Sequence, residues 1–366
     1  MRRVISLWLP NFATERLSRK EPTLDGRPFV TVTAVQGGLR VAAPSAVAET
    51  EGIRPSLPLT DARAQLPGLK AFPADPVGDA KALAHIAEWC GAYTPWTAPE
   101  AGGEILEGGG AGVWLDATGC AHLFGGEAKL TRMLIARIQR LGFTARVGLA
   151  ETPGAAWAVA RFGHADRAEL DGNKGDVGRI VPPGGVRAAL TPLSVMALRL
   201  PVDVVEGLYG LGLRHVGDLL NVPRAPLTAR FGDVITRRLD QALGRVFEPI
   251  SPRPETLPMR VRVMPAEPLG QHTDIAVGLK RLLRQLEARL RRKHLGARRL
   301  VLNLYHVDGE VSRASIGASR PARDPDHLFR LFADRLEGLD PGFGIEVMAL
   351  AAPVTEPLSP EQIPLA

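Results

Sequence analysis

Short apolar runs alternate along this chain with amphipathic stretches, as in proteins that contain both strands and helices. Val4–Leu9 and Val113–Leu115 are apolar runs with the length and composition of buried strands. Glu127–Leu141 carries leucine and isoleucine at helical spacing, and the strand-like run Thr144–Ala150 follows it. We therefore expect the first two runs to be neighbouring strands of one sheet, followed by a helix and a further strand.

The first hundred residues contain short expected helices and strands, and the last hundred contain a regular succession of strands and helices. The first set comprises expected helices at 11–20, 45–51, 59–66 and 79–91 and expected strands at 29–33 and 38–42. Pro249–Pro258 contains four prolines and is typical of a semi-rigid linker. The second set, in the order strand, helix, strand, strand, helix, strand, lies at 260–264, 273–294, 300–306, 311–316, 326–339 and 345–350. The predicted fold class is α+β, with several domains.

The charge balance is basic, and the composition is otherwise ordinary. At 366 residues, 45% of them hydrophobic, the chain is long enough for two to four domains. A net charge of +6 permits nucleic-acid binding without requiring it. No run reaches the roughly 18 apolar residues of a membrane span, so we expect a cytoplasmic protein. Two cysteines, Cys90 and Cys120, exclude a disulfide framework and are expected to be buried free thiols.

Two motifs give these patterns a likeness to a known family. Leu115-Asp-Ala-Thr-Gly119 ends the second strand, and Gly148-Leu-Ala-Glu-Thr-Pro153 follows the amphipathic helix. In this order the motifs resemble the palm of a Y-family DNA polymerase. The family carries two aspartates on the first strand and an Asp-Glu pair on the second. The resemblance places these four residues on Leu7, Leu9, Ala111 and Gly112.

The positions that hold metal in the family have therefore lost their oxygen ligands. Such a polymerase uses two divalent metal ions about 3.5–4 Å apart. Magnesium requires oxygen ligands, which Leu, Ala and Gly side chains do not have. The family's Tyr and Arg contacts to the triphosphate correspond to Ala46 and Glu49, and a glutamate would repel a triphosphate. The branch of the family that departs in this way is ImuB, which implies a polymerase-shaped protein without polymerase activity.

Four more positions follow from the resemblance. The aromatic residue that screens the sugar corresponds to Phe12, and two lysines that face the triphosphate correspond to Pro153 and Trp157. Asp116 matches a structural aspartate of the family, so we expect it to be hydrogen-bonded rather than to bind metal.

The resemblance covers nearly the whole chain and implies a right-hand arrangement of palm, fingers, thumb and little finger. The thumb is expected to contain a helix-hairpin-helix. The implied palm is 1–10 and 75–168, the fingers 11–74, the thumb 169–246, the linker 247–258, the little finger 259–351 and the tail 352–366.

The thumb motif Gly210–Leu219 is similar to the family's second helix-hairpin-helix, whose glycines let backbone N–H groups approach a phosphate. DNA contacts are therefore expected at Gly210, Gly212 and Arg214. The first hairpin of the pair has lost its glycines at Leu200–Asp203. A glycine-rich turn between helices remains the alternative.

A basic run in the expected little finger is the second candidate DNA contact. Nine Lys and Arg lie between Lys280 and Arg299, against the single acid Glu287. Leucines at helical spacing turn inward, so the charge faces outward. The alternative is a solvated basic face, but in this domain we expect sequence-independent phosphate contacts. The expected residues are Lys280, Arg281, Arg284, Arg291, Arg292, Lys293, Arg298 and Arg299.

The chain ends Gln362-Ile-Pro-Leu-Ala366, which is similar to the peptide by which polymerases bind the sliding clamp. Gln362 would hydrogen-bond at the rim of the clamp groove. Ile363 and Leu365 would fill an apolar pocket there.

Two functions from different classes follow. The first is a noncatalytic scaffold for damage-induced mutagenesis and translesion synthesis, within DNA repair and the SOS response. It would bind primer–template DNA and bring together the sliding clamp, an ImuA-type RecA-like protein and an error-prone C-family DNA polymerase. The second is an active Y-family translesion polymerase of low efficiency, with its carboxylates elsewhere in the sequence. A generic basic nucleic-acid-binding protein would require the palm resemblance to be accidental. We expect no cofactor and no metal, and association with the nucleoid.

Overall fold

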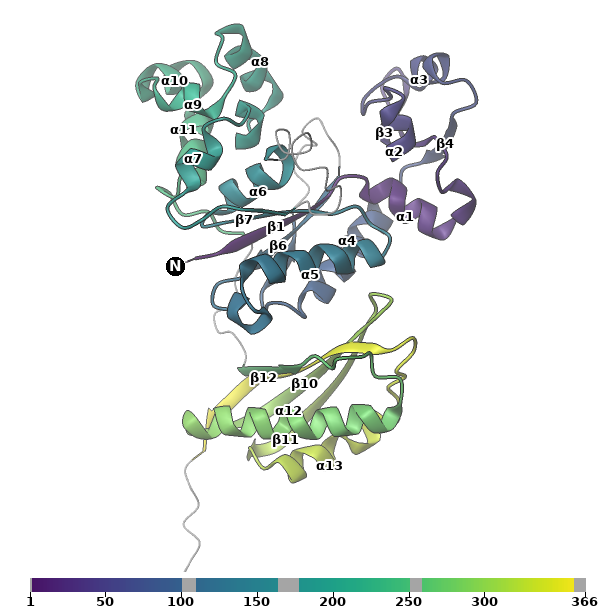
Figure 1. The fold of residues 1–366 in the computed structure, drawn as a ribbon, viewed down its shortest axis with the longest axis vertical. Helices are drawn as coiled ribbons and strands as arrows, with labels where there is room; N and C mark the ends of the chain where they lie inside the picture. Colours follow the sequence, from purple (N-terminus) through teal and green to yellow (C-terminus); the bar gives the residue numbers. More distant parts are fainter. Residues whose placement is uncertain (1, 101–109, 164–177, 251–258, 359–366) are drawn as a thin grey trace, which may run out of the picture. The chain divides into compact units, whose positions relative to one another are not determined.

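The computed structural model describes residues 2–100, 110–163, 178–250 and 259–358 (Figure 1). The chain divides into two compact units. Unit 1 comprises Met1–Ala87 and Trp96–Pro252, and unit 2 comprises Glu88–Pro95 and Arg253–Ala366. The boundary after Pro252 falls within the proline-rich segment that the sequence indicated.

Unit 1 is built on a five-stranded sheet in the order β5-β6-β1-β7-β8. β1 lies between β6 and β7 and is antiparallel to both, so that Ile5 is opposite Leu115 and Leu149. The prediction that the first two apolar runs are neighbouring strands is therefore confirmed. The strands are β1 (Val4–Leu9), β5 (Thr97–Pro99), β6 (Ala111–Asp116), β7 (Arg146–Ala150) and β8 (Gly178–Ile180).

Helices lie on both faces of this sheet, with α6 (Pro153–Phe162) on one face and α5 (Glu127–Arg140) on the other (Figure 1). α5 is the expected amphipathic helix, and its leucines and isoleucines are buried. α6 approaches the sheet very closely, because a Cβ added to Gly148 would lie 2.1 Å from the Ala156 carbonyl oxygen. Only glycine permits this separation, which places the side chains of α6 directly against β1 and β7.

A three-stranded sheet in the order β3-β2-β4 forms a second small core within unit 1. β2 and β3 are the antiparallel pair that the sequence predicted. β4 adds a parallel strand that the pattern did not reveal, because it is only four residues long. In chain order, the elements of residues 12–90 are α1 (Phe12–Lys20), η1 (Pro22–Leu24), β2 (Phe29–Val35), β3 (Gly38–Pro44), α2 (Ala46–Thr50), α3 (Leu59–Gln65), β4 (Lys70–Pro73) and α4 (Pro76–Cys90), and the last residues of α4 belong to unit 2.

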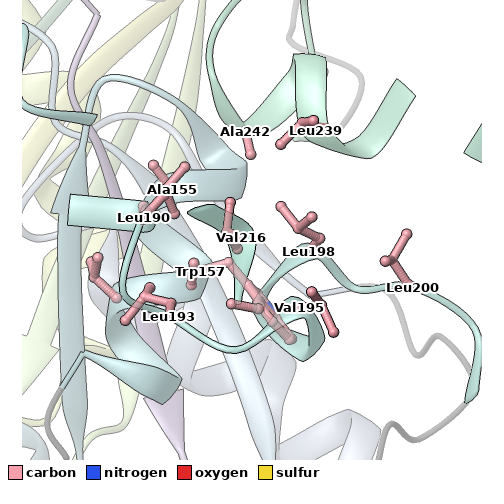
Figure 2. Packing of buried hydrophobic residues seen from close by; sticks show 14 of the residues in the cluster. Ala155, Trp157, Leu190, Leu193, Val195, Leu198, Leu200, Val216, Leu239 and Ala242 are labelled. Atoms are coloured by element: carbon pink, nitrogen blue, oxygen red, sulfur yellow. The ribbon is translucent and has the colours of Figure 1, made fainter. Parts of the chain in front are cut away.

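Short helices in the last part of unit 1 pack against α6 through one hydrophobic cluster (Figure 2). Ala155 and Trp157 of α6 lie in this cluster with Leu198, Val216 and Leu239. β8, which lies in the range expected for the thumb, pairs with β7 and so extends the five-stranded sheet. The remaining elements of unit 1 are η2 (Ala121–Phe124), α7 (Val186–Leu190), η3 (Val195–Leu198), α8 (Val202–Gly210), α9 (Val216–Leu220), α10 (Arg224–Phe231) and α11 (Asp233–Ala242).

Unit 2 contains a four-stranded sheet in the order β11-β10-β12-β9, with two helices on one side (Figure 1). The predicted order of strand, helix, strand, strand, helix, strand is confirmed. The elements are β9 (Met259–Val263), α12 (His272–Arg292), β10 (Leu295–His306), β11 (Val311–Ala322), α13 (Pro325–Leu336) and β12 (Ile345–Pro357).

The last strand is longer than the sequence suggested, so the expected start of the tail at residue 352 is wrong. β12 continues past Pro353, and Val354 still pairs with Arg299 of β10. Proline lacks an N–H and interrupts a regular ladder, but it is tolerated at a bulge. The pairing of β12 with β10 shifts register at this point, which accommodates the proline.

Candidate active-site position and nucleic-acid interfaces

The two leucines that replace the first pair of aspartates lie in the core of unit 1. Leu7 and Leu9 are both fully buried in β1. The Ser6 hydroxyl lies 3.4 Å from Arg161 Nη1 of α6, so Ser6 faces α6. Because neighbouring residues of a strand point to opposite faces, Leu7 and Leu9 point away from α6. A carboxylate at either position would be surrounded by core side chains.

An arginine–glutamate pair occupies the α6 side of the same sheet. Glu100 Oε2 accepts a hydrogen bond from Arg161 Nη2 at 2.7 Å, and Glu100 Oε1 accepts one from Trp157 Nε1 at 2.6 Å. The Arg161 guanidinium also lies 4.2 Å from the centre of the Trp157 ring. Glu100 follows β5, whereas Arg161 and Trp157 belong to α6. The pair therefore joins the edge of the sheet to the helix that covers it.

A second indole ring completes this cluster. The Trp8 ring has the Arg161 guanidinium 5.3 Å from its centre and the Arg146 guanidinium 5.2 Å from its centre. Trp8 and Arg146 face each other across the pairing of β1 with β7. Contacts of this kind between a guanidinium and an aromatic face are favourable, most of all where water is excluded.

Gly112, at one of the lost metal-ligand positions, borders the ion pair directly. A Cβ added there would lie 1.9 Å from Glu100 Oε2 and 3.2 Å from Arg161 Nη2. The neighbouring position, Ala111, pairs with Leu9. The space into which a longer side chain at residue 112 would extend is thus filled by the carboxylate of Glu100.

Burial and charge act in opposite directions on Arg161. The pKa of its guanidinium is lowered to about 10: burial is the largest cause, the carboxylate of Glu100 opposes it, and the nearby Arg199 adds to it. Arg199 is itself paired with Glu248, whose Oε1 lies 2.7 Å from Arg199 Nη2. Glu248 was expected in the linker, but it is buried in unit 1. At neutral pH Arg161 remains a cation.

The residues at this position do not fit a two-metal polymerase site. Within the described ranges no three His, Cys, Asp or Glu side chains gather where they could hold a metal ion. Asp116 accepts a hydrogen bond from Thr118 N at 3.0 Å, which confirms that it is hydrogen-bonded. Glu15 accepts hydrogen bonds from the N–H and hydroxyl of Thr144. Each carboxylate therefore already has partners within the chain.

The two cysteines form neither a disulfide nor a metal site within the described residues. Both are free thiols. Cys90 is buried, as expected, and burial raises the pKa of its thiol. Cys120 is only partly buried, so the expectation of a buried thiol is wrong there.

The positions that match triphosphate contacts do not form a triphosphate site. Ala46 and Glu49 are exposed on the short helix α2. Phe12 is buried against the Phe143 ring, with 5.2 Å between ring centres, so it serves the core rather than a sugar-binding surface. Trp157 is buried in the cluster that joins α6 to the helices of the thumb.

The thumb turn lies between α8 and α9, as predicted, but its backbone donors are already used. The N–H groups of Leu211, Gly212 and Leu213 donate to carbonyls at the end of α8. Those of Arg214 and His215 donate to the Asp218 carboxylate. The expected phosphate contact through N–H groups is therefore not supported at this turn. What it offers an anion is the exposed side chain of Arg214.

The basic residues expected in the little finger divide between a helix and a strand. Lys280, Arg281 and Arg284 are exposed on α12, and Lys280 Nζ also lies 4.7 Å from the Phe329 ring centre. Arg281 and Arg284 form no ion pair within the described part of the chain. Others have partners: Arg291 pairs with Glu287 at 2.7 Å, Arg292 donates to the Ala288 carbonyl, and Arg298 pairs with Glu356 at 3.1 Å. Lys293 caps α12, and Arg299 lies exposed in β10.

A second basic face of unit 2 was missed from the sequence. Val261 of β9 packs with the helices, so Arg260 and Arg262 point to the other side of the sheet. There Arg262 Nη1 donates to the Ala92 carbonyl at 2.7 Å, and Arg260 Nη2 donates to the Tyr305 hydroxyl at 2.9 Å. The alternation of arginine and valine in β9 was the signal that could have identified this face.

The candidate clamp peptide, Gln362, Ile363 and Leu365, lies outside the described residues. Among the residues that the structure does describe, no helix is both long enough and apolar enough to cross a membrane.

Comparison with known proteins places the chain in a family. Two models of the impB/mucB/samB family match it, one over residues 7–161 and the C-terminal-domain model over 262–365. The chain belongs to the impB/mucB/samB family. It is 38% identical over 311 residues to the protein named ImuB of Caulobacter vibrioides, covering 85% of this chain and 64% of that protein. It is 26% identical to DNA polymerase IV of Halorhodospira halophila, covering 96% of this chain and 92% of that enzyme.

Solved structures of DNA polymerases share the fold. The insertion ternary complex of Dbh DNA polymerase aligns with a TM-score of 0.53 and 15% identity, covering 95% of this chain and 98% of that one. DinB from Sulfolobus solfataricus aligns with a TM-score of 0.52 and 15% identity, covering 96% and 98%. The α+β, Y-family polymerase-like fold expected from the sequence is thus confirmed. The chain spans 64% of the length of the curated relatives named ImuB.

Proposed function

We propose that this chain is a noncatalytic, polymerase-shaped subunit that binds DNA during damage-induced mutagenesis. The observation that carries the proposal is the ion pair of Arg161 with Glu100, which lies beside Gly112 where the family has a metal-binding glutamate. Metal-ion catalysis of nucleotidyl transfer needs carboxylates that hold two cations. Here the nearest carboxylate is engaged by a guanidinium and an indole N–H.

DNA binding rests on exposed positive charge rather than on base recognition. Arg281 and Arg284 are exposed and without ion pairs in the described part of α12, and Arg214 is exposed in the thumb turn. Contacts of such side chains with phosphates are independent of sequence and weaken steeply with salt. We propose that these residues, with Lys280 and Arg299, form the DNA contacts, while Arg291, Arg292 and Arg298 contribute less because they have partners within the chain.

The partners follow from the family and from the C-terminal peptide. In this proposal Gln362, Ile363 and Leu365 bind the sliding clamp, and other surfaces bind an ImuA-type RecA-like protein and an error-prone C-family polymerase at the nucleoid. The similarity to a protein named ImuB supports this assignment.

Primer extension tests the catalytic half of the proposal. The full chain is incubated with a primed template, first with magnesium and then with manganese, at concentrations where a gel shift shows the DNA bound. The expected result is that the chain binds the DNA but adds no nucleotide to the primer. Extension that persists after contaminating polymerases have been controlled for would refute the proposal.

An active polymerase of low efficiency is the second candidate, and the similarity to a DNA polymerase IV across 96% of the chain favours it. It requires carboxylates at other positions to reach the primer end. Substituting Glu100 would discriminate, since a polymerase that used this carboxylate would lose its activity with Glu100→Gln. A scaffold has no activity to lose.

A further inference from the structure

We infer that Arg161, together with Glu100, occupies the α6-side space beside Gly112, one of the four positions where the family carries a metal ligand, so that a glutamate restored at residue 112 alone would meet a filled space and a positive charge. This inference rests on the proposed noncatalytic function and gives it a structural cause.

The guanidinium of Arg161 is held on several sides. Glu100 accepts its hydrogen bond at 2.7 Å, and the Ser6 hydroxyl lies 3.4 Å from its other terminal nitrogen. The rings of Trp157 and Trp8 lie 4.2 Å and 5.3 Å from the guanidinium carbon. A planar, delocalised cation suits such a site, because it can stack on indole rings while its edge binds a carboxylate. Only 11% of its side chain is exposed.

Local sequence explains why the cation reaches this place. Thr152 caps the start of α6 by accepting the Ala155 N–H at 3.1 Å. The small residues that follow allow α6 to lie against Gly148 of the sheet. Arg161 then falls in the last turn of α6, over the β1–β6 pair.

The same arrangement excludes the family's glutamate from residue 112. Its Cβ alone would collide with Glu100 Oε2, and its carboxylate would compete with that of Glu100 for one guanidinium. A divalent cation brought to this position would be repelled by Arg161. Restoring a glutamate at residue 112 therefore leaves both the collision and the positive charge in place.

Thermal melting of the full chain, without DNA or nucleotide, tests the role of the pair. Arg161→Met and Glu100→Gln are measured singly and together. Each single change leaves one buried charge without its partner, so Arg161→Met is expected to lower the melting temperature by roughly 10 °C. The melting temperature of the double variant is expected to fall by much less than the sum of the two single decreases. Arg224→Met with Asp240→Asn is the matched control, an ion pair of the same unit in which Arg224 is half exposed.

A second set of variants tests the filled space. Gly112→Ala should lower the melting temperature in the wild-type background. The decrease should be smaller in a Glu100→Ala background, where the colliding oxygen is absent. Gly270→Ala is the control, since a Cβ there meets nothing within 4 Å. Millimolar magnesium or manganese should leave the melting temperature of the wild type unchanged.

Three results would overturn the inference: additive effects of Arg161→Met and Glu100→Gln, a cost of Gly112→Ala that is independent of Glu100, or a manganese-induced rise in wild-type melting temperature. These outcomes are separate from primer extension. A chain that shows the expected coupling and yet extends primers would refute the proposed function, whereas an inactive chain without coupling would refute only the role of Arg161.

Discussion

Two arginine-rich regions of this chain use the same side chain in opposite ways. In unit 1, Arg161 and Arg199 are largely buried, and each pairs with a glutamate. In unit 2, Arg281 and Arg284 are exposed on α12 and lack such partners within the described residues. A buried cation must be neutralised locally, because removing it from water is costly. An exposed cation remains free to bind an external anion. Position, rather than residue type, separates the structural charges from those that remain available to an external anion.

The largest expected effect comes from moving α6. In Gly148→Ala the new Cβ would lie within 3 Å of both the Ala156 oxygen and the Ala160 nitrogen, so the helix must shift. We expect a loss of about 3 kcal/mol in the free energy of unfolding. Urea denaturation measures it, with Gly270→Ala as the control. An unchanged midpoint would mean that α6 does not hold Arg161 in place through this contact.

Removing the exposed charges tests the other side of the comparison. The triple variant Lys280→Gln, Arg281→Gln, Arg284→Gln should weaken DNA binding on the order of tenfold and reduce the slope of log affinity against log salt by about 3. Fluorescence anisotropy over a salt series measures both quantities. Arg63→Gln, which removes an exposed charge from α3, serves as the control. Equal slopes for the triple variant and wild type would exclude α12 as a DNA contact.

Arg260 and Arg262, on the sheet face of unit 2, can be compared with the exposed arginines of α12, because both already donate hydrogen bonds to acceptors within the chain. Arg262 donates to the carbonyls of Ala92 and Tyr93. Arg262→Gln should therefore cost about 1–2 kcal/mol of stability and change DNA affinity less than the α12 variant does. Melting and anisotropy on the same samples decide this. A large loss of affinity at unchanged stability would instead assign DNA binding to the sheet face.

The smallest expected effect is a pH dependence in the thumb. Hydrogen bonding to Arg224 holds the pKa of Asp240 below its ordinary value of 3.8, and Arg245 adds to this. The stabilisation is present above that value and is lost as the pH falls through the lower pKa of the folded state. Asp240→Asn should make unfolding less sensitive to pH in the acidic range below 4. A parallel pH profile for variant and wild type would contradict this.

Much of the fold could be predicted because its signals are local. The length and apolar composition of Val4–Leu9 predicted a buried strand, and the leucines of α12 predicted its inner face. The four-residue β4 and the end of β12 were missed, because a short strand carries little pattern and Pro353 imitates a chain break. The N–H groups of the thumb turn were also misjudged, since their hydrogen-bond partners depend on how α8 ends.

The sequence by itself determined that Leu7, Leu9, Ala111 and Gly112 bind no metal through their side chains, because no fold can add oxygen atoms to them. The tertiary structure alone decided which residues lie beside Gly112. Glu100 and Arg161 are 61 residues apart and share no motif. They meet because β5 and α6 border the same part of the sheet, and because glycine at residue 112 leaves space for the carboxylate. Residue chemistry is local, whereas the pairing of distant charges depends on packing.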